Sequence, residues 1–563
     1  MVGESRKWVI LIASIWIQAL TGTNFDFSSY SSDMKSVLDI TQLQLNYISV
    51  ASDMGKAFGW CCGLSLFYFP FWLVIFISAF LGLLGYGLQW LLIIRLITLP
   101  YILVLFLSLI AGCSISWFNT ICYVLCIKHF SANRSLALSL SISFNGVSAA
   151  LYTLIANAIN SSDHTHYLLL NALVPVIISI VVLIPILQEP QPWPHSLEII
   201  QRDSIVFLWL NILALFTGLY LLFLYPISSS STAARIVLAG AIFLLVLFLF
   251  LPGIVYSREW SWFTVSTTSF SLYNSRFNSI GNDDDYELKE ELIGKKNNAT
   301  NNGSSESERE NQCCFVNVLL ETDNITMLGE EHPTRLLISR WDFWLYYIAY
   351  FCGGTIGLVY SNNLGQISQS LGHISQITSL VTLYSTSSFF GRLLSAAPDF
   401  LSGKIQFART GWFALALVPT PIAFILLANF GNKAALQICT SMIGLSSGFV
   451  FSAAVSITSE LFGPNSVGVN HNILITNIPL GSCLYGLLAA LIYDSNAGSL
   501  MHDPKWLREM TICIGRKCYF QTFICWGFIS MLGLLSSFLL FLRTKEAYDN
   551  FERDKNINIT QSI

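Results

Sequence analysis

Charged side chains are scarce in this sequence. Only 11% of its 563 residues are Asp, Glu, Lys or Arg, whereas 54% are hydrophobic; an ordinary soluble domain carries about 25% charged residues. A hydrophobic excess over this length does not fit inside one globular core, because single cores stop growing at about 250 to 300 residues. The composition therefore excludes an ordinary soluble protein and predicts that a lipid bilayer surrounds most of the chain.

The sequence also lacks the short motifs of nucleotide-driven and metal-dependent proteins. It contains no Gly-rich phosphate-binding loop, no paired Cys-x-x-Cys motifs and no His-Glu-x-x-His motif. Its eight histidines are scattered, and a net charge of −4 provides no basic field for nucleic acid. We therefore expect no enzymatic activity, no cofactor, no metal site and no nucleic-acid partner.

Hydrophobic segments of the roughly 20 residues that a membrane-spanning helix needs recur along the chain. Their pattern is six, two and six, so we predict an all-α polytopic membrane protein with two six-helix halves and two extra helices between them. The predicted segments are 8–30, 45–67, 71–92, 100–127, 135–158, 166–187, 204–226, 233–256, 341–364, 375–397, 407–428, 433–459, 466–493 and 519–542.

The predicted parts of the chain follow from this pattern. They are an N-terminal half at 1–187, a connection with the two extra helices at 188–256, a loop at 257–339, a C-terminal half at 340–545 and a tail at 546–563. The loop is acidic and rich in Asn and Ser, so it cannot bury enough apolar surface to fold. We expect a flexible cytosolic loop, either regulatory or a plain linker, whose protein partners the sequence does not reveal.

Basic residues in the connections predict the orientation, because they concentrate on the cytosolic side. If the N-terminus is cytosolic, that side receives Arg6, Lys7, Lys128, Arg134, Arg202, Lys404, Arg409, Arg543 and Lys545. The bias is incomplete, since several basic residues fall on the other side. We expect both termini in the cytosol, while the membrane stays open between endoplasmic reticulum or nuclear envelope, plasma membrane and vacuole. Cys513 and Cys518 then lie in a non-cytosolic connection, where a disulfide can persist.

The two halves carry an internal repeat. Gly55-Lys56 and Gly391-Arg392 are 336 positions apart, and each pair lies in the second segment of its half. The connection after the fourth segment repeats as well, with Phe130–Asn133 matching Phe462–Asn465. Many transporters are built from two such repeats and bind their solute near mid-membrane, where the repeats meet. The repeat therefore favours a transporter.

Several longer motifs connect the sequence to a known family. They are Thr21–Phe27, Trp117–Thr120, Ala132–Leu138, Ser143–Ser148, Ser395–Asp399 and Gly468–Asn477. Together they resemble the plant nodulin-like family of the major facilitator superfamily, in the branch named for defects in nuclear fusion. The resemblance covers nearly the whole membrane part of the chain and is poorest in the loop. It implies the major facilitator fold and an alternating-access carrier in a bilayer.

A shorter segment, Ser395–Lys404, resembles the loop motif that follows the second helix in major facilitator proteins. This resemblance implies that Asp399 and Lys404 take part in a conformational latch at helix ends. Glu460, at a neighbouring helix end, is either a third member of the latch or a solvated charge. In the first half the matching positions are Gly59 and Gly63, so the acid is absent there.

Arg392 is the main candidate for binding a solute. It lies about eleven residues, or roughly 16 Å, into its segment, with no acidic residue three or four positions away. A guanidinium near mid-membrane needs a partner from another helix or from a solute, and carboxylates fit its geometry. Lys56 occupies the symmetric position, so two cations could bind one organic anion; structural pairing with an acid is the alternative. Asn119, Asn145 and Asn362 are further solute-binding candidates or contacts between helices.

Three residues are candidates for proton exchange. Asp26 lies near the outer end of the first segment, or in water if the helix ends earlier. Asp53 shares a helix face with Lys56, so the two could simply neutralise each other. His471 is a titratable group or a hydrogen-bonded structural histidine.

These residues predict alternating-access transport of a small, anionic solute with proton coupling as an option. Two alternatives stay open. Asp26, Asp53 and His471 would be ligands if the protein carried a cation or metal ion. The family resemblance also allows a non-transporting endomembrane or nuclear-envelope protein that is required for nuclear fusion.

Overall fold

The computed structural model describes most of the chain. The described residues are 2–22, 27–40, 42–159, 166–187, 197–224, 230–250, 253, 325, 327–373, 377–401, 407–498 and 513–561. Asp26, Lys404 and most of the predicted loop lie outside them.

All predicted segments coincide with helices where the chain is described. The N-terminal half consists of α1 (Val2–Thr21), α2 (Phe27–Leu38), α3 (Gln42–Lys56), α4 (Gly59–Tyr68), α5 (Phe71–Ile93), α6 (Tyr101–His129), α7 (Arg134–Ser143), η2 (Phe144–Val147), α8 (Ser148–Ile159), α9 (His166–Val181) and α10 (Leu183–Leu187). The C-terminal half consists of α15 (Trp341–Ala349), η4 (Tyr350–Thr355), α16 (Ile356–Ser370), α17 (Ile377–Leu394), α18 (Ala397–Leu401), α19 (Arg409–Leu417), α20 (Pro419–Asn429), α21 (Lys433–Leu461), α22 (Val467–Ile475), α23 (Asn477–Gly498) and α24 (Lys517–Gln561). The extra helices are α11 (Leu197–Leu224) and Ser231–Phe250.

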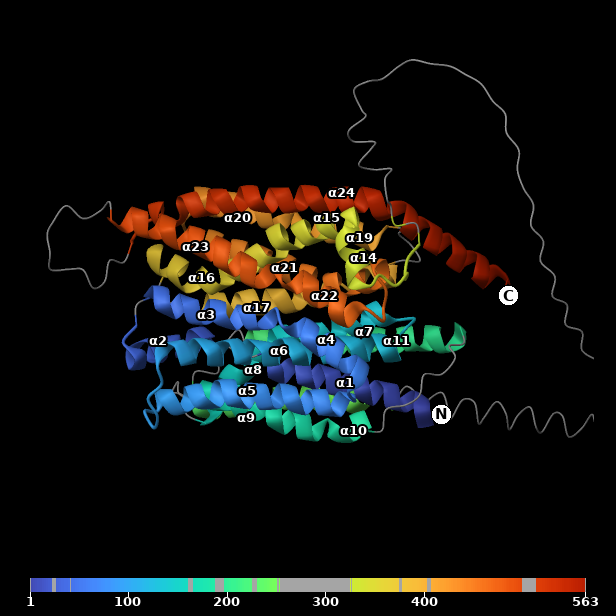
Figure 1. Cartoon of the computed structure of the whole chain (residues 1–563), viewed down its shortest axis with the longest axis horizontal. Coiled ribbons are helices and arrows are strands. Elements are labelled where there is room, and N and C mark those ends of the chain that lie inside the picture. The colour runs from blue at the N-terminus through green and yellow to red at the C-terminus, as the bar shows by residue number, and fades with distance from the viewer. Residues whose placement is uncertain are drawn as a thin grey trace, which may run out of the picture. The chain divides into compact units, whose positions relative to one another are not determined.

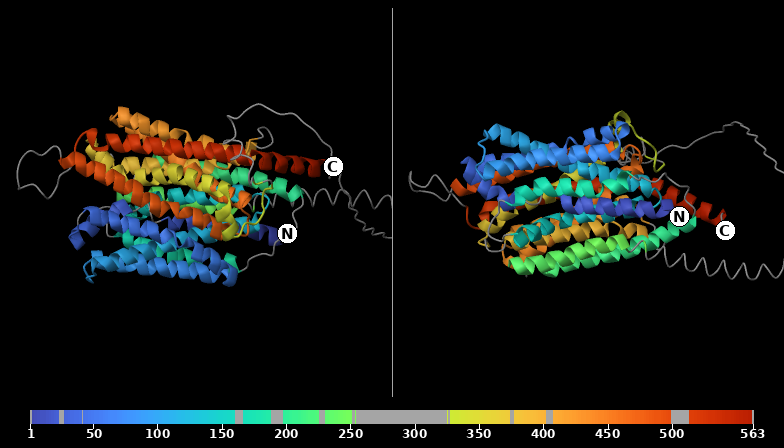
Figure 2. Two further views of the ribbon diagram at one scale, coloured as in Figure 1. Left: turned by 45° about the horizontal axis from the view of Figure 1, so that its top comes forward. Right: turned by 90° about the horizontal axis from the view of Figure 1, so that it is seen from below.

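The helices of the two halves form adjacent groups, blue to teal and yellow to red in Figure 1. The N and C labels mark the same end of the bundle in Figures 1 and 2. We call this end the termini end and the other the opposite end. The chain as a whole therefore crosses the bundle an even number of times, as the fourteen predicted segments require.

Ten helices in the described part of the chain are long and apolar enough to cross a membrane. The second segment of each half is not among them. α17 is rich in Ser and Thr and contains Arg392, and α3 ends at Lys56 before a break leads into α4. Segments that face another helix group tolerate such polar side chains, whereas segments that face lipid do not. α3 and α17 are therefore candidates for lining a pathway.

Local sequence explains where several helices begin or break. Pro70 and Pro100 precede α5 and α6 in extended conformation, and Asn432 caps α21 by accepting a hydrogen bond from the Ala435 amide at 2.9 Å. The fifth segment of the N-terminal half is interrupted by the 3₁₀ turn η2, and the first segment of the C-terminal half by the π turn η4. Such interruptions often mark functional positions.

The internal repeat reappears in the packing of the second segment against the fourth. Four glycines allow backbones to touch there, because any Cβ would collide with a carbonyl oxygen. Such a Cβ would lie 2.0 Å from Leu109 O at Gly55, 2.0 Å from Leu445 O at Gly391, 1.8 Å from Ser52 O at Gly112 and 2.1 Å from Ser388 O at Gly448. Corresponding glycines, and the carbonyls that they meet, are 336 positions apart. The predicted repeat is therefore confirmed, in one register in both halves.

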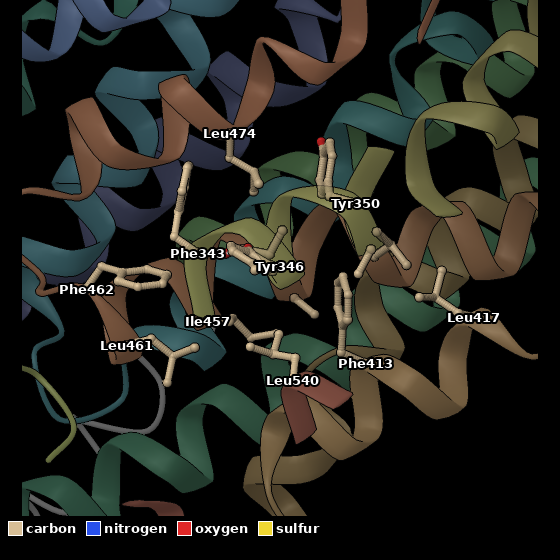
Figure 3. Packing of buried hydrophobic residues seen from close by; sticks show 14 of the residues in the cluster. Phe343, Tyr346, Tyr350, Phe413, Leu417, Ile457, Leu461, Phe462, Leu474 and Leu540 are labelled. Carbon is tan, nitrogen blue, oxygen red and sulfur yellow. The ribbon is translucent and has the colours of Figure 1, made fainter. Parts of the chain in front are cut away.

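A large apolar cluster unites the termini end of the C-terminal half. Figure 3 shows Phe343 and Tyr346 of α15 among Phe413 of α19, Ile457 of α21 and Leu540 of α24. All five are at most 2% exposed, and the Tyr346 hydroxyl donates to the Ala454 carbonyl at 2.6 Å. Buried aromatic and aliphatic side chains from four segments make this half a stable unit.

The extra helices attach to both halves. Lys7 of α1 pairs with Asp203 of α11 at 2.5 Å, and both side chains are buried. Further along α11, a Cβ at Gly218 would lie 2.3 Å from the Phe389 ring of α17. The first extra helix is therefore anchored to the N-terminal half and touches the C-terminal half through a close glycine contact.

The end of the predicted flexible loop is folded, which corrects the sequence prediction for residues 327–339. Leu337, in the short helix α14 (Thr334–Ser339), is fully buried in the cluster of Figure 3. Both Glu331 carboxylate oxygens accept hydrogen bonds from the turn before α22, including the Asn465 amide at 2.8 Å and the Ser466 hydroxyl at 2.7 Å. We call Gly329–His332 the strap. A carboxylate at a helix N-terminus stabilises the helix, so the strap is part of the fold.

Cys513 and Cys518 form a disulfide at the opposite end of the bundle. Both cysteines are buried, and the Gly515 amide between them donates to the Ser370 carbonyl at the end of α16 at 2.8 Å. The short loop that the disulfide closes is thus hydrogen-bonded to the end of α16.

Candidate functional site

The two halves meet where the second segment of each half packs against the fifth segment of the other. α17 packs against α7 and η2; we call this contact the Arg392 crossing. α3 packs against α23; we call this contact the Asp53 crossing. The internal repeat relates the two crossings, so the polar groups at both can be compared directly.

Arg392 connects the halves at the crossing that bears its name. Its Nη1 donates to Asn145 Oδ1 at 3.0 Å and to the Ile142 carbonyl at 3.3 Å. Both acceptors belong to the N-terminal half: Ile142 lies near the end of α7, and Asn145 lies within η2. Since Arg392 is only 5% exposed, its charge on one half is held by polar groups of the other half.

Aromatic side chains surround the Arg392 guanidinium. Its Cζ lies 5.9 Å from the centroid of the Phe451 ring, and the phenols of Tyr123, Tyr350 and Tyr384 are the nearby polar aromatic groups. Tyr350 begins the π turn η4. Aromatic faces attract a guanidinium. The result is a positively charged, aromatic-lined position between the halves.

Asn119 and His471 lie beside the same aromatic group. Asn119 precedes Tyr123 by four residues on α6, so they share a helix face, and its buried Oδ1 has no hydrogen-bond partner among the described residues. The His471 ring is edge-on to Tyr123 at 5.6 Å, and its Nδ1 lies 3.4 Å from Thr458 Oγ1. The structure therefore brings two more predicted candidates near Arg392.

At the Asp53 crossing, the acid and the base neutralise each other. Lys56 Nζ lies 2.6 Å from Asp53 Oδ1, and Ser482 of the other half donates to Asp53 Oδ2 at 2.7 Å. Asp53 is 3% exposed and Lys56 7%. This is the arrangement that we kept as the alternative to two solute-binding cations. Lys56 and Arg392 belong to different crossings.

A cavity of about 30 Å³ borders the Asp53 crossing. Asp53 and Asn362 both line it, one from each half. Asn362, unlike Asp53, is exposed. The cavity therefore brings a predicted proton-exchanging group and a predicted solute-binding group to one place.

Four side chains join the halves at the termini end, and we call them the latch. Arg409 Nη2 lies 2.6 Å from Asp399 Oδ1, and its Nε lies 3.0 Å from Glu460 Oε1. Ser135 of the N-terminal half donates to Asp399 Oδ1 at 2.8 Å and accepts from Arg409 Nη2 at 3.0 Å. The predicted latch residues Asp399 and Glu460 thus meet through Arg409, while Lys404 lies outside the described residues.

The strap is attached to the latch through the backbone. The Gly329 amide donates to the Glu460 carbonyl at 2.6 Å, and the His332 amide donates to the Phe462 carbonyl at 3.2 Å. The segment that follows the acidic loop is thereby fixed to the helix end that carries a latch acid.

Glycines replace the latch acid in the first half, and the structure gives the reason. A Cβ at Gly63 would lie 2.3 Å from the Gly468 carbonyl of α22, and one at Gly59 would lie 2.1 Å from Asn472 Oδ1. Asn472 also donates to Thr120 Oγ1 of the N-terminal half at 2.8 Å. Small residues let helices approach closely in membranes. The halves thus meet here through close glycine contacts, whereas at the latch they meet through the hydrogen bonds of Ser135 with Asp399 and Arg409.

The comparisons with known proteins place this geometry in a family. A profile of the nodulin-like family matches residues 7–256, and a profile of the NFD4 C-terminal domain matches residues 326–550. Protein NUCLEAR FUSION DEFECTIVE 4 of Arabidopsis thaliana is 53% identical over 100% of this chain and 93% of its own length. The chain belongs to the nodulin-like family. The predicted family is therefore confirmed, and the C-terminal profile starts at the folded segment that contains the strap.

More distant relatives agree with the fold of this nodulin-like protein. A probable transporter, MCH1 of Wickerhamomyces anomalus, is 26% identical over 32% of this chain and 37% of its own length. The solved structure of the proton:xylose symporter XylE, a major facilitator protein, covers 95% of both chains with a TM-score of 0.51 and 12% identity. The predicted major facilitator fold is confirmed, and the nodulin-like chain is an integral, multi-pass membrane protein.

Sequence reasoning missed Arg409 as the centre of the latch. We counted it only as a basic residue near a connection. The signal in the sequence is its position ten residues after Asp399, at the start of the next segment. Its second partner, Glu460, is 51 residues away, and only the packing of α19 against α21 brings the two together.

Proposed function

We propose that this nodulin-like protein carries a small organic anion by alternating access and that Arg392 is its main solute-binding group. The observation that carries the proposal is the place of Arg392: a buried cation of one half whose hydrogen bonds end on Asn145 and Ile142 of the other. A solute bound at this position contacts both halves, as an alternating-access site requires.

The guanidinium geometry supports an anion as the solute. A carboxylate can accept two parallel hydrogen bonds from one guanidinium. It would compete with Asn145 Oδ1 and the Ile142 carbonyl for Nη1, replacing a bond between the halves by a bond to solute. Binding would then change the relative stability of the conformations in which this contact between the halves is closed or open. A ligand shifts a conformational equilibrium in this way. Asn119 would supply a further polar contact.

Asp53 is the proton-exchanging group in this proposal. Protonating its carboxylate weakens the attraction of Lys56 and leaves an unbalanced positive charge at the crossing. An anion would be attracted by that charge, so proton and anion would move together. His471, beside Tyr123, and Asp26, outside the described residues, are the second choices for the same role.

The latch closes one face of the carrier in this scheme. We assign the termini end to the cytosol, in line with the basic residues there. Ser135 would part from Asp399 and Arg409 when the carrier opens to the cytosol, while the opposite end closes.

A thermal-shift screen of the purified protein against metabolites tests the proposal. A solute at a hundred times its dissociation constant adds about 2.7 kcal/mol to the stability of the protein. Wild type should be stabilised by an organic anion, Arg392→Gln should lose the response, and Arg392→Lys should keep only part of it, since Lys cannot form the paired hydrogen bonds. An anion that stabilises Arg392→Gln as strongly as wild type contradicts the assignment.

A role in nuclear fusion is the second candidate, because the Arabidopsis relative at 53% identity bears that name. It is distinguished by complementation in plants that lack the relative. If the Arg392→Gln variant restores nuclear fusion while binding no anion, the carrier activity is not what fusion requires. The cation alternative is weaker, since no group of three metal-binding side chains occurs in the described part of the chain.

A further inference from the structure

The cavity at the Asp53 crossing is polar and has room for roughly two water molecules, since one needs about 10 to 15 Å³. Its volume is about 30 Å³. It is lined by Phe27, Tyr30, Ile48, Ser49, Ser52, Asp53, Tyr86, Gln89, Ser108, Ala111 and Asn362. Hydroxyl, amide and carboxylate groups dominate this lining. Such groups supply the several hydrogen-bonding partners that an internal water requires.

The lining residues all lie on the side of the bundle that is nearer to the opposite end. Ser49 and Ser52 lie in the first turns of a segment that starts at the opposite end, and Gln89 lies in the last turns of one that ends there. Ser108 and Asn362 occupy equivalent depths on α6 and α16. The cavity therefore occupies the half of the bundle away from the latch.

Exposure decreases along the cavity. Asn362 is exposed, and Ser49 and Ser52 are half-buried. Gln89 and Asp53 are 2% and 3% exposed. The cavity thus has a mouth at Asn362 and a floor at Asp53.

We propose that this cavity is a water-filled proton vestibule, through which Asp53 exchanges a proton with the solution at the opposite end. The inference rests on the proton exchange at Asp53 proposed above and assigns it an entry route. Gln89 and Ser108 are positioning residues that hold the inner water, with Gln89 Nε2 donating to Ser108 Oγ at 3.2 Å. The bound species are water and hydronium.

The charges around Asp53 suit this role. On its own helix it faces Lys56 at 2.6 Å. α2 and α5 present the phenols of Tyr30 and Tyr86 to the cavity. The other packed elements present neutral groups: Ser108 from α6, Asn362 from α16 and Ser482 from α23. Among the described groups that lie against Asp53, Lys56 is therefore the one fully charged partner.

The proton transfer is balanced and has a mechanical consequence. A hydronium in the cavity gives one proton to the Asp53 carboxylate, leaving water and a neutral carboxylic acid, and the Asp53–Lys56 pair changes from neutral to a charge of plus one. The hydrogen bond from Ser482 to the carboxylate weakens, because a neutral acceptor binds a donor less strongly than a charged one. Protonation thus loosens a contact between the halves.

Infrared difference spectroscopy of the full chain in lipid nanodiscs tests the vestibule without any solute. The carboxylic-acid band that appears when the pH is lowered is assigned to Asp53 by its loss in Asp53→Asn. The rate at which this band shifts after transfer to D₂O reports access to Asp53. Asn362→Leu and Gln89→Leu should slow the shift by about tenfold, as expected when one hydrogen-bonded water link is lost.

Asn363→Leu is the matched control. It lies beside Asn362 on α16, but its Nδ2 donates to the Val359 carbonyl of its own helix at 2.9 Å. It should exchange at the wild-type rate. Equal rates in Asn362→Leu, Gln89→Leu and wild type overturn the vestibule, as does equal slowing in Asn363→Leu. An unchanged band in Asp53→Asn overturns proton exchange at Asp53, while anion binding at Arg392 is judged separately by thermal shift.

Discussion

Ser135→Ala should shift the protein toward the conformation that is open at the termini end. The Ser135 hydroxyl is the latch group contributed by the N-terminal half, and it makes two hydrogen bonds to charged partners, at 2.8 Å to Asp399 and 3.0 Å from Arg409. The ion pairs of Arg409 with Asp399 and Glu460 lie within the C-terminal half and survive the substitution. The change therefore weakens the contact between the halves without leaving a charge unpaired.

The expected size follows from the bonds that are lost. Hydrogen bonds to charged groups contribute about 1.5 to 3 kcal/mol to stability. Losing the equivalent of one such bond in the closed conformation alone shifts the closed-to-open ratio by roughly 10-fold to 150-fold, since about 1.4 kcal/mol corresponds to a factor of ten. Single-molecule fluorescence can measure the ratio with dyes on exposed positions of each half at the termini end, such as Trp72 and Phe400. The dyes are attached through unnatural amino acids, because the chain holds free cysteines.

Ser139→Ala is the control for this experiment. It lies one turn further along α7, and its hydroxyl donates to the Leu136 carbonyl of its own helix at 3.1 Å. It should leave the distribution of distances unchanged. A Ser135→Ala distribution that matches wild type, or an equal shift in Ser139→Ala, refutes the latch as a determinant of the closed state.

Two further substitutions test the other contacts that hold the helices together. Gly59→Ala forces a methyl group against Asn472, so it should destabilise the closed contact between α4 and α22 by about 1 to 3 kcal/mol. Gly486→Ala is the control, because no atom lies within 4 Å of its new Cβ. The same fluorescence distances measure both effects. Lys7→Met removes the buried cation that pairs with Asp203 and should lower the free energy of unfolding by about 3 to 5 kcal/mol, with partial recovery in Lys7→Arg. Thermal unfolding in detergent measures this loss, and a Lys7→Met protein as stable as wild type would show that the pair does not anchor the first extra helix.

The arrangement of helices could be predicted because it depends on a strong physical signal. Some 20 apolar residues are needed to cross a bilayer, and backbone groups in lipid must bond within a helix. Hydropathy therefore locates each segment, although it does not show interruptions. Neither η2 nor the separation of α3 from α4 is visible in the average hydropathy of its segment, and α2 was merged with the first segment.

The strap could not be predicted, because its stabilising contacts come from distant residues. Its neighbourhood has the polar composition of a linker, and the two buried apolar side chains among its described residues, Ile325 and Leu337, are too few to give a periodic signal. Glu331 finds its donors at Asn465 and Ser466, more than 130 residues away. Composition predicts disorder correctly only where no other part of the fold offers such partners.

The sequence identified candidate residues more readily than it identified the partners with which they interact. The cost of a buried charge identifies Asp53, Lys56 and Arg392 from sequence alone. Which charge meets which depends on helix rotation, and a rotation of one residue moves a side chain by about 100°. The spacing of Asp53 and Lys56 allowed either a solute site or a mutual pair, and the structure forms the pair.

The broken symmetry of the repeat explains why the two crossings can have different roles. Related positions carry Lys56 and Arg392, and corresponding glycines make the same close helix contacts around both. Lys56 has an acid three residues away on its own helix, whereas the helix of Arg392 offers Ser and Phe at the corresponding distances. The Asp53–Lys56 pair lies within one helix and moves as a unit when the halves rearrange, so a proton can control its charge.

Arg392 is bonded to the other half and must exchange partners when the halves separate, so a solute can take the place of those partners. The two repeat-related positions would thus serve different roles, a proton site at Asp53 and an anion site at Arg392. If so, the infrared band of Asp53 should persist in Arg392→Gln.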